Sequence, residues 1–140
     1  MKFKTKDLTV INSMNKDTLM EKLSMECIEV LENGLKIKMP VNASTHQPMG
    51  LLHGGASAAL IESIGSMGSA LLLDIEKEVP VGVEINANHL TGVREGVVVA
   101  TGILVHGGRR THVWQVDIHT EDGAIHVCTG RLTVMIIPRS

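Results

Sequence analysis

The 140-residue chain has almost no aromatic side chains: Phe3 and Trp114 are its only Phe, Tyr or Trp residues. Single-stranded nucleic acids are held largely by aromatic side chains on which bases stack, so this class of binding has little support. The charge balance gives no support for nucleic-acid binding either, because 13 Lys and Arg against 15 Asp and Glu leave a formal net charge of −2. Phosphate backbones are bound through clustered positive charge. We therefore expect no nucleic-acid partner.

Cysteine is equally scarce, and Cys27 and Cys128 lie far apart in the chain. They make neither a disulfide framework nor a paired metal motif, so we expect both in the core and a reducing, cytoplasmic setting. Seven histidines are present, but none follows a metal-ligand spacing such as H-x-H, H-x-x-x-H or H-E-x-x-H. We predict no metal and no cofactor. The N-terminus also lacks the apolar stretch of a secretory signal.

The longest apolar run, residues 53–73 (HGGASAALIESIGSMGSALLL), has the length of a membrane span of ~20 residues. It nevertheless contains glycines, serines, a histidine and, near its middle, the carboxylate of Glu62. A charge at the bilayer centre is expensive, and the chain has no second run of this kind. We therefore expect a helix buried in protein and no membrane association.

The length predicts one domain over residues 1–140. Apolar spacing predicts a short helix, a strand bent or turned at Asn33-Gly34, a loop, and the long helix, at residues 17–24, 26–39, 40–52 and 53–73. Period-two alternation then predicts four strands joined by short turns, at 81–89, 97–105, 111–120 and 124–137. Consecutive strands with short connections favour an antiparallel sheet, and a helix apolar nearly all round must be covered on most sides. We predict an α+β fold, a curved antiparallel sheet wrapped around the helix.

The long helix begins at His53-Gly54-Gly55, with no Ser, Thr, Asp or Asn at the cap. The first N–H groups of a helix lack internal partners and carry partial positive charge, so this end can bind an anion or polarise a carbonyl oxygen. The alternative is that the glycines only form a tight turn into the helix.

Glu62 is the second unusual feature, because no Lys or Arg lies on the helix to pair with it. Its neighbours at helical spacing are all small: Ala58, Ala59, Gly65 and Ser66. An unpaired buried carboxylate is costly, so we favour a base or nucleophile over a Glu that is hydrogen-bonded to Ser66 or exposed at a gap. His53 lies nine residues away, about 900° and ~13.5 Å along the helix, on its opposite side. The two are either unrelated or brought together by a two-fold axis between subunits.

The stretches MGLLHGGASAALIESIGSMGS, VGVEINANHL, REG and HGGRRTHVWQVDI resemble the hotdog-fold acyl-CoA thioesterases of the phenylacetate/4-hydroxybenzoyl-CoA type, over residues 20–137. Within that family they are similar to bacterial 1,4-dihydroxy-2-naphthoyl-CoA thioesterases and aryl-carrier proofreading thioesterases. The resemblance implies a hotdog fold, a homodimer or homotetramer with active sites between subunits, and hydrolysis of an aromatic acyl-CoA or an acyl group on a carrier protein. CoA would then be part of the substrate, and menaquinone biosynthesis a pathway for such an enzyme.

Carried onto this chain, the resemblance implies that Glu62 is the nucleophile or the general base that activates water. The backbone N–H of Gly55 would polarise the thioester carbonyl with help from Gln47. His53 would orient the thioester, and Ser66 would hold the attacking water or Glu62.

The resemblance also implies contacts to the CoA arm and its phosphates from Gly82, His89, His106, Gly108, Arg109 and Arg110. Arginine suits phosphate because its donors form a fork. Relatives often have a basic residue directly after the NANH stretch, whereas this chain has Thr91-Gly92, and Arg94 is its next basic residue.

Two other functions remain open on this fold. One is a non-catalytic acyl-CoA or acyl-carrier binding protein, which would have no need of a lone carboxylate in the helix. The other is a dehydratase, which normally uses a His-Asp pair that this helix lacks. For the acyl group we expect a pocket lined by Met49, Ile61, Met67 and Leu71.

Overall fold

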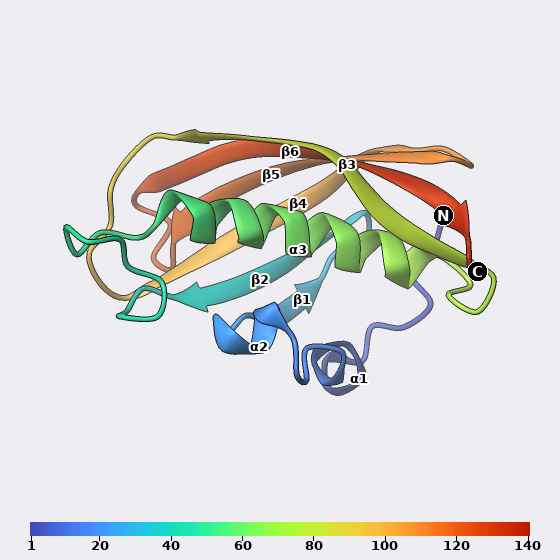
Figure 1. The fold of residues 1–140 in the computed structure, drawn as a ribbon, viewed down its shortest axis with the longest axis horizontal. Helices are drawn as coiled ribbons and strands as arrows, with labels where there is room; N and C mark the ends of the chain where they lie inside the picture. The colour runs from blue at the N-terminus through green and yellow to red at the C-terminus, as the bar shows by residue number, and fades with distance from the viewer.

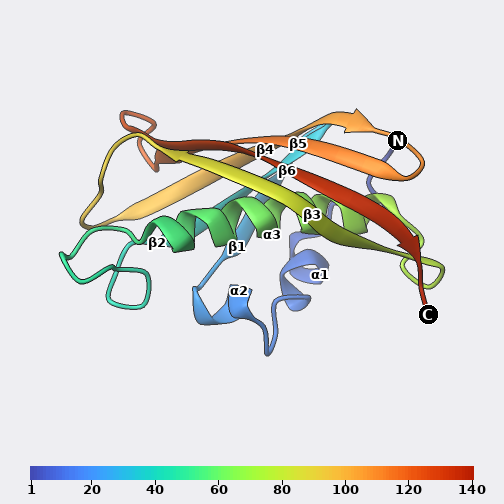
Figure 2. The ribbon, with the colours of Figure 1, turned by 45° about the horizontal axis from the view of Figure 1, so that its top comes forward.

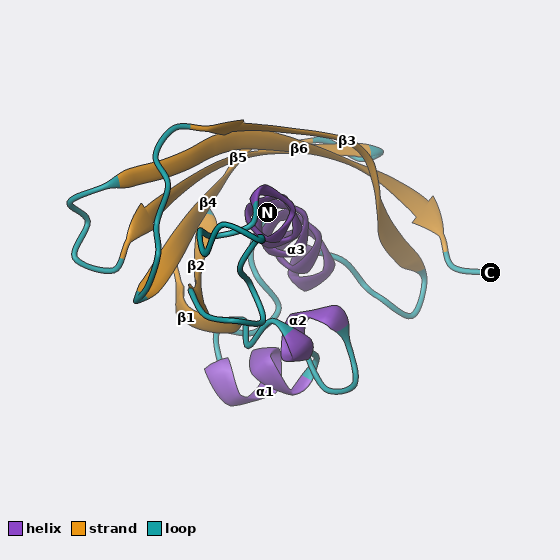
Figure 3. Cartoon of the chain, turned by 60° about the vertical axis from the view of Figure 1, so that its left-hand side comes forward, coloured by secondary structure: helices purple, strands orange, loops and turns teal.

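The computed structural model describes all residues 1–140 and contains one six-stranded antiparallel sheet with the order β1-β2-β4-β5-β6-β3. In chain order the elements are α1 (Leu8–Ser13), α2 (Leu19–Lys22), β1 (Glu26–Val30), β2 (Gly34–Pro40), α3 (Gly54–Leu72), β3 (Glu78–His89), β4 (Val97–Gly107), β5 (Thr111–Thr120) and β6 (His126–Pro138). The sheet curves around α3, as Figures 1 and 3 show. The predicted sheet wrapped around a long central helix is confirmed.

The position of β3 differs from the simplest interpretation of the sequence, in which each strand pairs with the next. β3 pairs with β6 and forms one edge of the sheet, while β4 lies between β2 and β5. The connection at residues 90–96 therefore passes around the start of α3, where the Val93 carbonyl accepts a hydrogen bond from the Leu52 N–H (2.7 Å). A connection of this length resembles a hairpin turn in sequence, although here it crosses from the edge strand β3 to β4 in the interior of the sheet. Because β3 pairs only with β6, its other side is unpaired.

The core forms where the concave face of the sheet meets α3. The alternation predicted in β5 is confirmed, since its inward side chains are all fully buried: His112, Trp114, Val116 and Ile118. Trp114 packs against Gly68, where a Cβ would collide with the indole ring. The glycine therefore lets the helix approach the sheet closely.

The N-terminal segment lies on the side of α3 that the sheet leaves open (Figures 2 and 3). The predicted helix over 17–24 shrinks to Leu19–Lys22, and α1 was not predicted. The β-branched residues of α1 disfavour a helix, and only Ile11 is buried, so its periodicity is weak. α1 is tied to β1 because the Asn12 side chain donates to the Cys27 carbonyl (2.9 Å) and accepts from the Cys27 N–H (2.8 Å).

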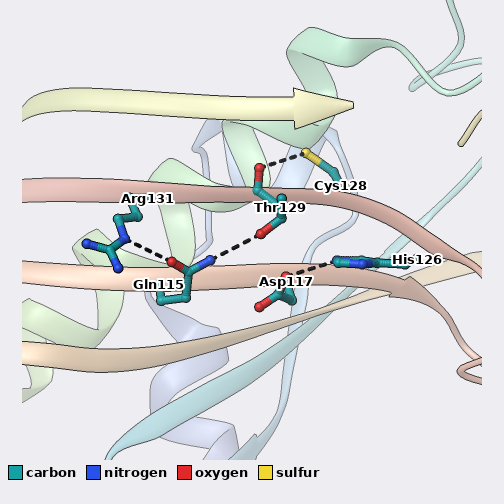
Figure 4. A network of polar contacts seen from close by, with 6 residues as sticks. All are labelled: Gln115, Asp117, His126, Cys128, Thr129 and Arg131. Atoms are coloured by element: carbon teal, nitrogen blue, oxygen red, sulfur yellow. Dashed lines mark hydrogen bonds and ion pairs between the residues drawn. The ribbon is translucent and has the colours of Figure 1, made fainter. Parts of the chain in front are cut away.

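The convex outer face of the sheet carries a network of polar contacts on β5 and β6 (Figure 4). Gln115 donates to Thr129 Oγ1 (3.1 Å) and accepts from Arg131 Nε (2.9 Å). His126 Nε2 lies 2.9 Å from Asp117 Oδ1. These cross-strand contacts satisfy the polar side chains on the face opposite the core.

Two further expectations concern buried groups. By length and composition α3 could cross a membrane, yet 61% of its most apolar window is buried inside the protein.

Cys27 and Cys128 are both free and buried, which confirms their place in the core. Burial raises the pKa of both thiols.

Candidate active site

His53 is the cap of α3. Its backbone is extended, and its Nδ1 accepts a hydrogen bond from the Gly55 N–H at 2.7 Å. The sequence suggested an uncapped helix because His is not among the usual capping residues. The ring is exposed, so it can turn away and free the Gly55 N–H for another acceptor. The loop before it is fixed by the His53 N–H, which donates to the Thr45 carbonyl (2.8 Å).

One cavity, here called the β3-side cavity, lies between the start of α3 and the end of β3. Its volume is about 280 Å³, and its lining includes Gln47, Gly54, Ser57 and His89. The His89 ring rests on the helix backbone, since a Cβ on Gly54 would lie 2.9 Å from Nε2. The Gln47 side-chain oxygen accepts from the Met49 N–H within the same loop. Gln47 and His89 thus both lie at the start of α3.

A second cavity, the α2-side cavity, lies on the other flank of the same helix end. Its volume is about 270 Å³. His53, Gly55 and Ala59 line it from the helix, and Leu19 and Leu23 line it from α2 and the residue after it. The N-terminus of α3 is therefore flanked by two cavities of similar size.

Glu62 lies two turns further along α3 and is half-buried. Its carboxylate lies against the backbone of Gly82 in β3, where a Cβ would collide with Oε1. It forms no hydrogen bond or ion pair with any residue of the chain, and Ser66, one turn on, does not bond to it. A carboxylate with free lone pairs on a strand edge can accept a proton or attack a carbon.

The predicted CoA contacts of the β4–β5 turn lie at the opposite end of α3. A side chain at Gly107 would meet Met1, and Gly107 shares a cavity with Leu72 at the last helical turn. The 19 residues of α3 span ~27 Å. One chain therefore does not bring the turn residues His106, Gly108, Arg109 and Arg110 together with the residues at the start of the helix.

The structure contains a buried polar cluster that the sequence did not indicate. Ser69 Oγ accepts a hydrogen bond from Trp114 Nε1 (2.9 Å) and lies 3.0 Å from Nδ1 of His112. His112 is fully buried. Burial lowers the pKa of His112, and the positive charge of His106 lowers it further. The alternation that puts His112 on the same face of the strand as Trp114 was the signal that could have indicated this burial.

The expected acyl pocket of Met49, Ile61, Met67 and Leu71 is wrong. Ile61, Met67 and Leu71 are buried in the core, while Met49 is 76% exposed on a loop. Met67 and Leu71 share a face of α3, whereas Met49 lies on the loop before the helix, so the four side chains do not line one cavity. Arg94 lies nearby, and its Nη1 donates to the Met49 carbonyl (3.2 Å). No three His, Cys, Asp or Glu side chains are grouped as metal ligands.

Comparison with known proteins identifies the family of the chain. Residues 49–126 match the model of the thioesterase superfamily. The chain is 42% identical over 130 residues to the 1,4-dihydroxy-2-naphthoyl-CoA hydrolase of Escherichia coli K12, covering 93% of this chain and 94% of the relative. A thioesterase variant from Pseudomonas aeruginosa superposes with a TM-score of 0.92 at 41% identity, covering 96% of both chains.

A thioesterase from Staphylococcus aureus superposes with a TM-score of 0.82 at 40% identity. The match covers 98% of the staphylococcal chain but 86% of this one. With α3 held inside a six-stranded antiparallel sheet, the chain belongs to the thioesterase superfamily, and it is a thioester hydrolase with the hotdog fold.

Proposed function

We propose that the protein hydrolyses an aromatic acyl-CoA thioester to the free acid and CoA, with Glu62 as base or nucleophile. The observation that carries this proposal is the half-buried carboxylate of Glu62, unpaired beside Gly82. The Escherichia coli relative, a 1,4-dihydroxy-2-naphthoyl-CoA hydrolase, supports the aromatic substrate class. CoA is the leaving arm of the substrate, and the proposed reaction uses no cofactor.

Water supplies the oxygen of the new carboxylic acid. As a base, Glu62 would take a proton from water while the oxygen adds to the thioester carbon. As a nucleophile, it would form an acyl-enzyme anhydride that water then cleaves. In both routes the C–S bond breaks, and the thiolate of CoA takes up a proton.

The start of α3 suits the carbonyl oxygen, on which negative charge develops. Its N–H groups point toward the loop side, and His53 would release the Gly55 N–H to the substrate oxygen. Donors already aimed at a developing oxyanion typically contribute ~10²–10³ in rate. Gln47 lies beside this helix end and would supply a further donor, while Ser66 would hold the water near Glu62.

A complete site needs a second copy of the chain. Gly55 and Glu62 are seven residues apart, so they share a face of α3 but are separated by ~10.5 Å along its axis. One carbonyl group cannot contact both. The unpaired edge of β3 exposes Val81, Val83 and Ile85, and Val83 is 54% exposed. Antiparallel pairing of two β3 edges would bring Glu62 of the partner subunit toward the first copy's helix start.

The same pairing would bring the second copy's β4–β5 turn toward that helix start, because the turn lies at the far end of α3. His89 of the first copy would contact the thiol arm of CoA. Gly82 would contact it from β3, the strand that pairs with the second copy. Arg109 and Arg110, both exposed, would bind the phosphates of CoA. We propose a homodimer, or a homotetramer built from two such dimers, that acts in a reducing cytoplasm where the two thiols remain free.

Replacement of Glu62 by Gln tests the proposed chemistry. The amide keeps the shape but removes the base, so we expect kcat for release of free thiol from 1,4-dihydroxy-2-naphthoyl-CoA and benzoyl-CoA to fall at least ~10²-fold. Glu121→Gln is the matched control, because Glu121 is an exposed carboxylate in the turn between β5 and β6 and does not lie on β3. It should keep wild-type turnover, and both variants should keep the wild-type melting temperature.

Full turnover by Glu62→Gln would contradict the role of Glu62. A wild-type protein that is stabilised by acyl-CoA but releases no thiol, from CoA or from an acyl-carrier protein, would favour the non-catalytic binding protein instead. Sedimentation tests the shared site, since a monomer with undiminished specific activity would contradict it.

A further inference from the structure

The two cavities at the start of α3 are built from different parts of the chain. The β3-side cavity is lined only by residues between Gln47 and Val127, nearly the range 49–126 that matches the family. The α2-side cavity takes Leu19 and Leu23 from the N-terminal segment, outside that range. One cavity therefore lies almost wholly within the matched range, and the other takes part of its wall from the N-terminal segment.

The N-terminal segment, residues 1–25, precedes the sheet and the long helix. The sheet and α3 occupy residues 26–138. The Staphylococcus aureus thioesterase leaves about 14% of this chain unmatched, on the order of 20 residues, while 98% of its own length is covered. The first 25 residues are the segment of comparable length that precedes the sheet and helix. A thioesterase at 40% identity thus has the fold in a match that leaves out about as many residues as this segment contains.

A thioester substrate has two arms with different recognition needs. The thiol arm is the same in every acyl-CoA, whereas the acyl arm changes from one substrate to another. We propose that the α2-side cavity holds the acyl group, that the β3-side cavity holds the thiol arm, and that Leu19 and Leu23 determine which acyl groups fit. This assignment rests on the proposed function, because it places the thioester carbonyl at the Gly55 N–H.

The lining of the α2-side cavity is apolar at Leu19, Leu23, Ala56 and Ala59 and polar at Ser44, Thr45, His46 and His53, which suits a ring that carries polar groups. Its helical floor has no bulky side chains, since Gly55 and Ala59 lie there on the same face of α3 as Glu62. Leu19 and Leu23 form an apolar wall opposite that floor, and Leu19 is 60% exposed. At about 270 Å³ the cavity is near the small end of ligand pockets, ~300 Å³, so the size of its wall residues limits what enters.

Leu19→Trp is the direct test, because the larger side chain fills the cavity from an exposed position that tolerates bulk. We expect kcat/KM for 1,4-dihydroxy-2-naphthoyl-CoA to fall at least tenfold, while that for acetyl-CoA stays within twofold of wild type. Val10→Trp is the matched control: Val10 is 50% exposed on α1, in the same segment but outside this cavity. Its ratio of the two kcat/KM values should equal that of wild type.

Leu19→Ala provides the opposite change, a wider cavity, and should raise kcat/KM for the naphthoyl substrate relative to benzoyl-CoA. The inhibition constant of free CoA should be unchanged in both Leu19 variants. An equal loss with all acyl groups, an unchanged ratio, or a raised inhibition constant for CoA would overturn the assignment. A wild-type preference for alkyl over aromatic thioesters would contradict the proposed substrate instead, and the ratio of bulky to small substrates would still test the cavity.

Discussion

α3 carries glycines in both halves, and the two sets have different surroundings. At Gly68 a Cβ would collide with the buried ring of Trp114, and at Gly65 it would lie 2.5 Å from Leu132. At Gly55 it would meet only the exposed ring of His53, at 2.9 Å. The second half of the helix uses glycine to pack against the sheet, whereas the first half uses it to leave the backbone accessible.

The consequence is a helix with a rigid half and an open half. The second half is fixed by close packing and by the Ser69 bonds to the sheet. The first half is flanked by two cavities and by loops on both sides. Substitutions in the second half should therefore change the free energy of unfolding, and those in the first half should change turnover.

Gly68→Ala should give the largest loss of stability. The added methyl overpacks a rigid, fully buried indole ring, which typically costs ~1–3 kcal/mol. The better helix propensity of Ala offsets at most ~1 kcal/mol of this. We expect the free energy of unfolding to fall by about 1–2 kcal/mol in urea titrations. An unchanged midpoint would show that the two halves of the helix do not differ as described.

Gly55→Ala should have the opposite effect: it should lower turnover and leave the free energy of unfolding nearly unchanged. His53 is exposed and can move aside, and Ala favours the helix, so the free energy of unfolding should stay within ~0.5 kcal/mol of wild type. The methyl narrows access to the Gly55 N–H, and a displacement of ~1 Å at a reacting group can cost ~10²-fold in rate. We expect kcat/KM to fall by roughly tenfold to a hundredfold. A stable variant with wild-type turnover would remove Gly55 from the proposed site.

The sequence contained enough to predict the architecture, because α3 and the strands have strong, distinct periods. The period-two alternation predicted the strand β5 correctly, and the lone Glu62 among small residues marked the candidate site. The edge position of β3 was not predictable from local pattern, since the connection at 90–96 has the length and composition of a turn. Which strand a segment joins depends on partners that are distant in sequence.

The positions of the candidate site residues were harder to predict from the sequence than their identities. The capping by His53 depends on a backbone conformation that the sequence does not specify. The separation of Arg109 and Arg110 from the helix start follows from strand lengths that carry the β4–β5 turn to the far end of α3. The α2-side cavity depends on a four-residue helix, whose periodicity is too short to show which side its leucines face.

His112 gives the smallest predicted effect, and it tests whether the rigid half also responds to pH. Burial lowers the pKa of His112 in the folded state, so below its unfolded value of ~6.5 the unfolded chain binds more protons. Stability is therefore complete above that pH and declines as pH falls through it. Unfolding measured between about pH 5 and 8 should show this decline, and His112→Gln should flatten it. Trp114→Phe removes the indole N–H that donates to Ser69 without removing a titrating group, so it should lower stability at every pH and keep the slope. A slope that persists in His112→Gln would assign the pH dependence to another group.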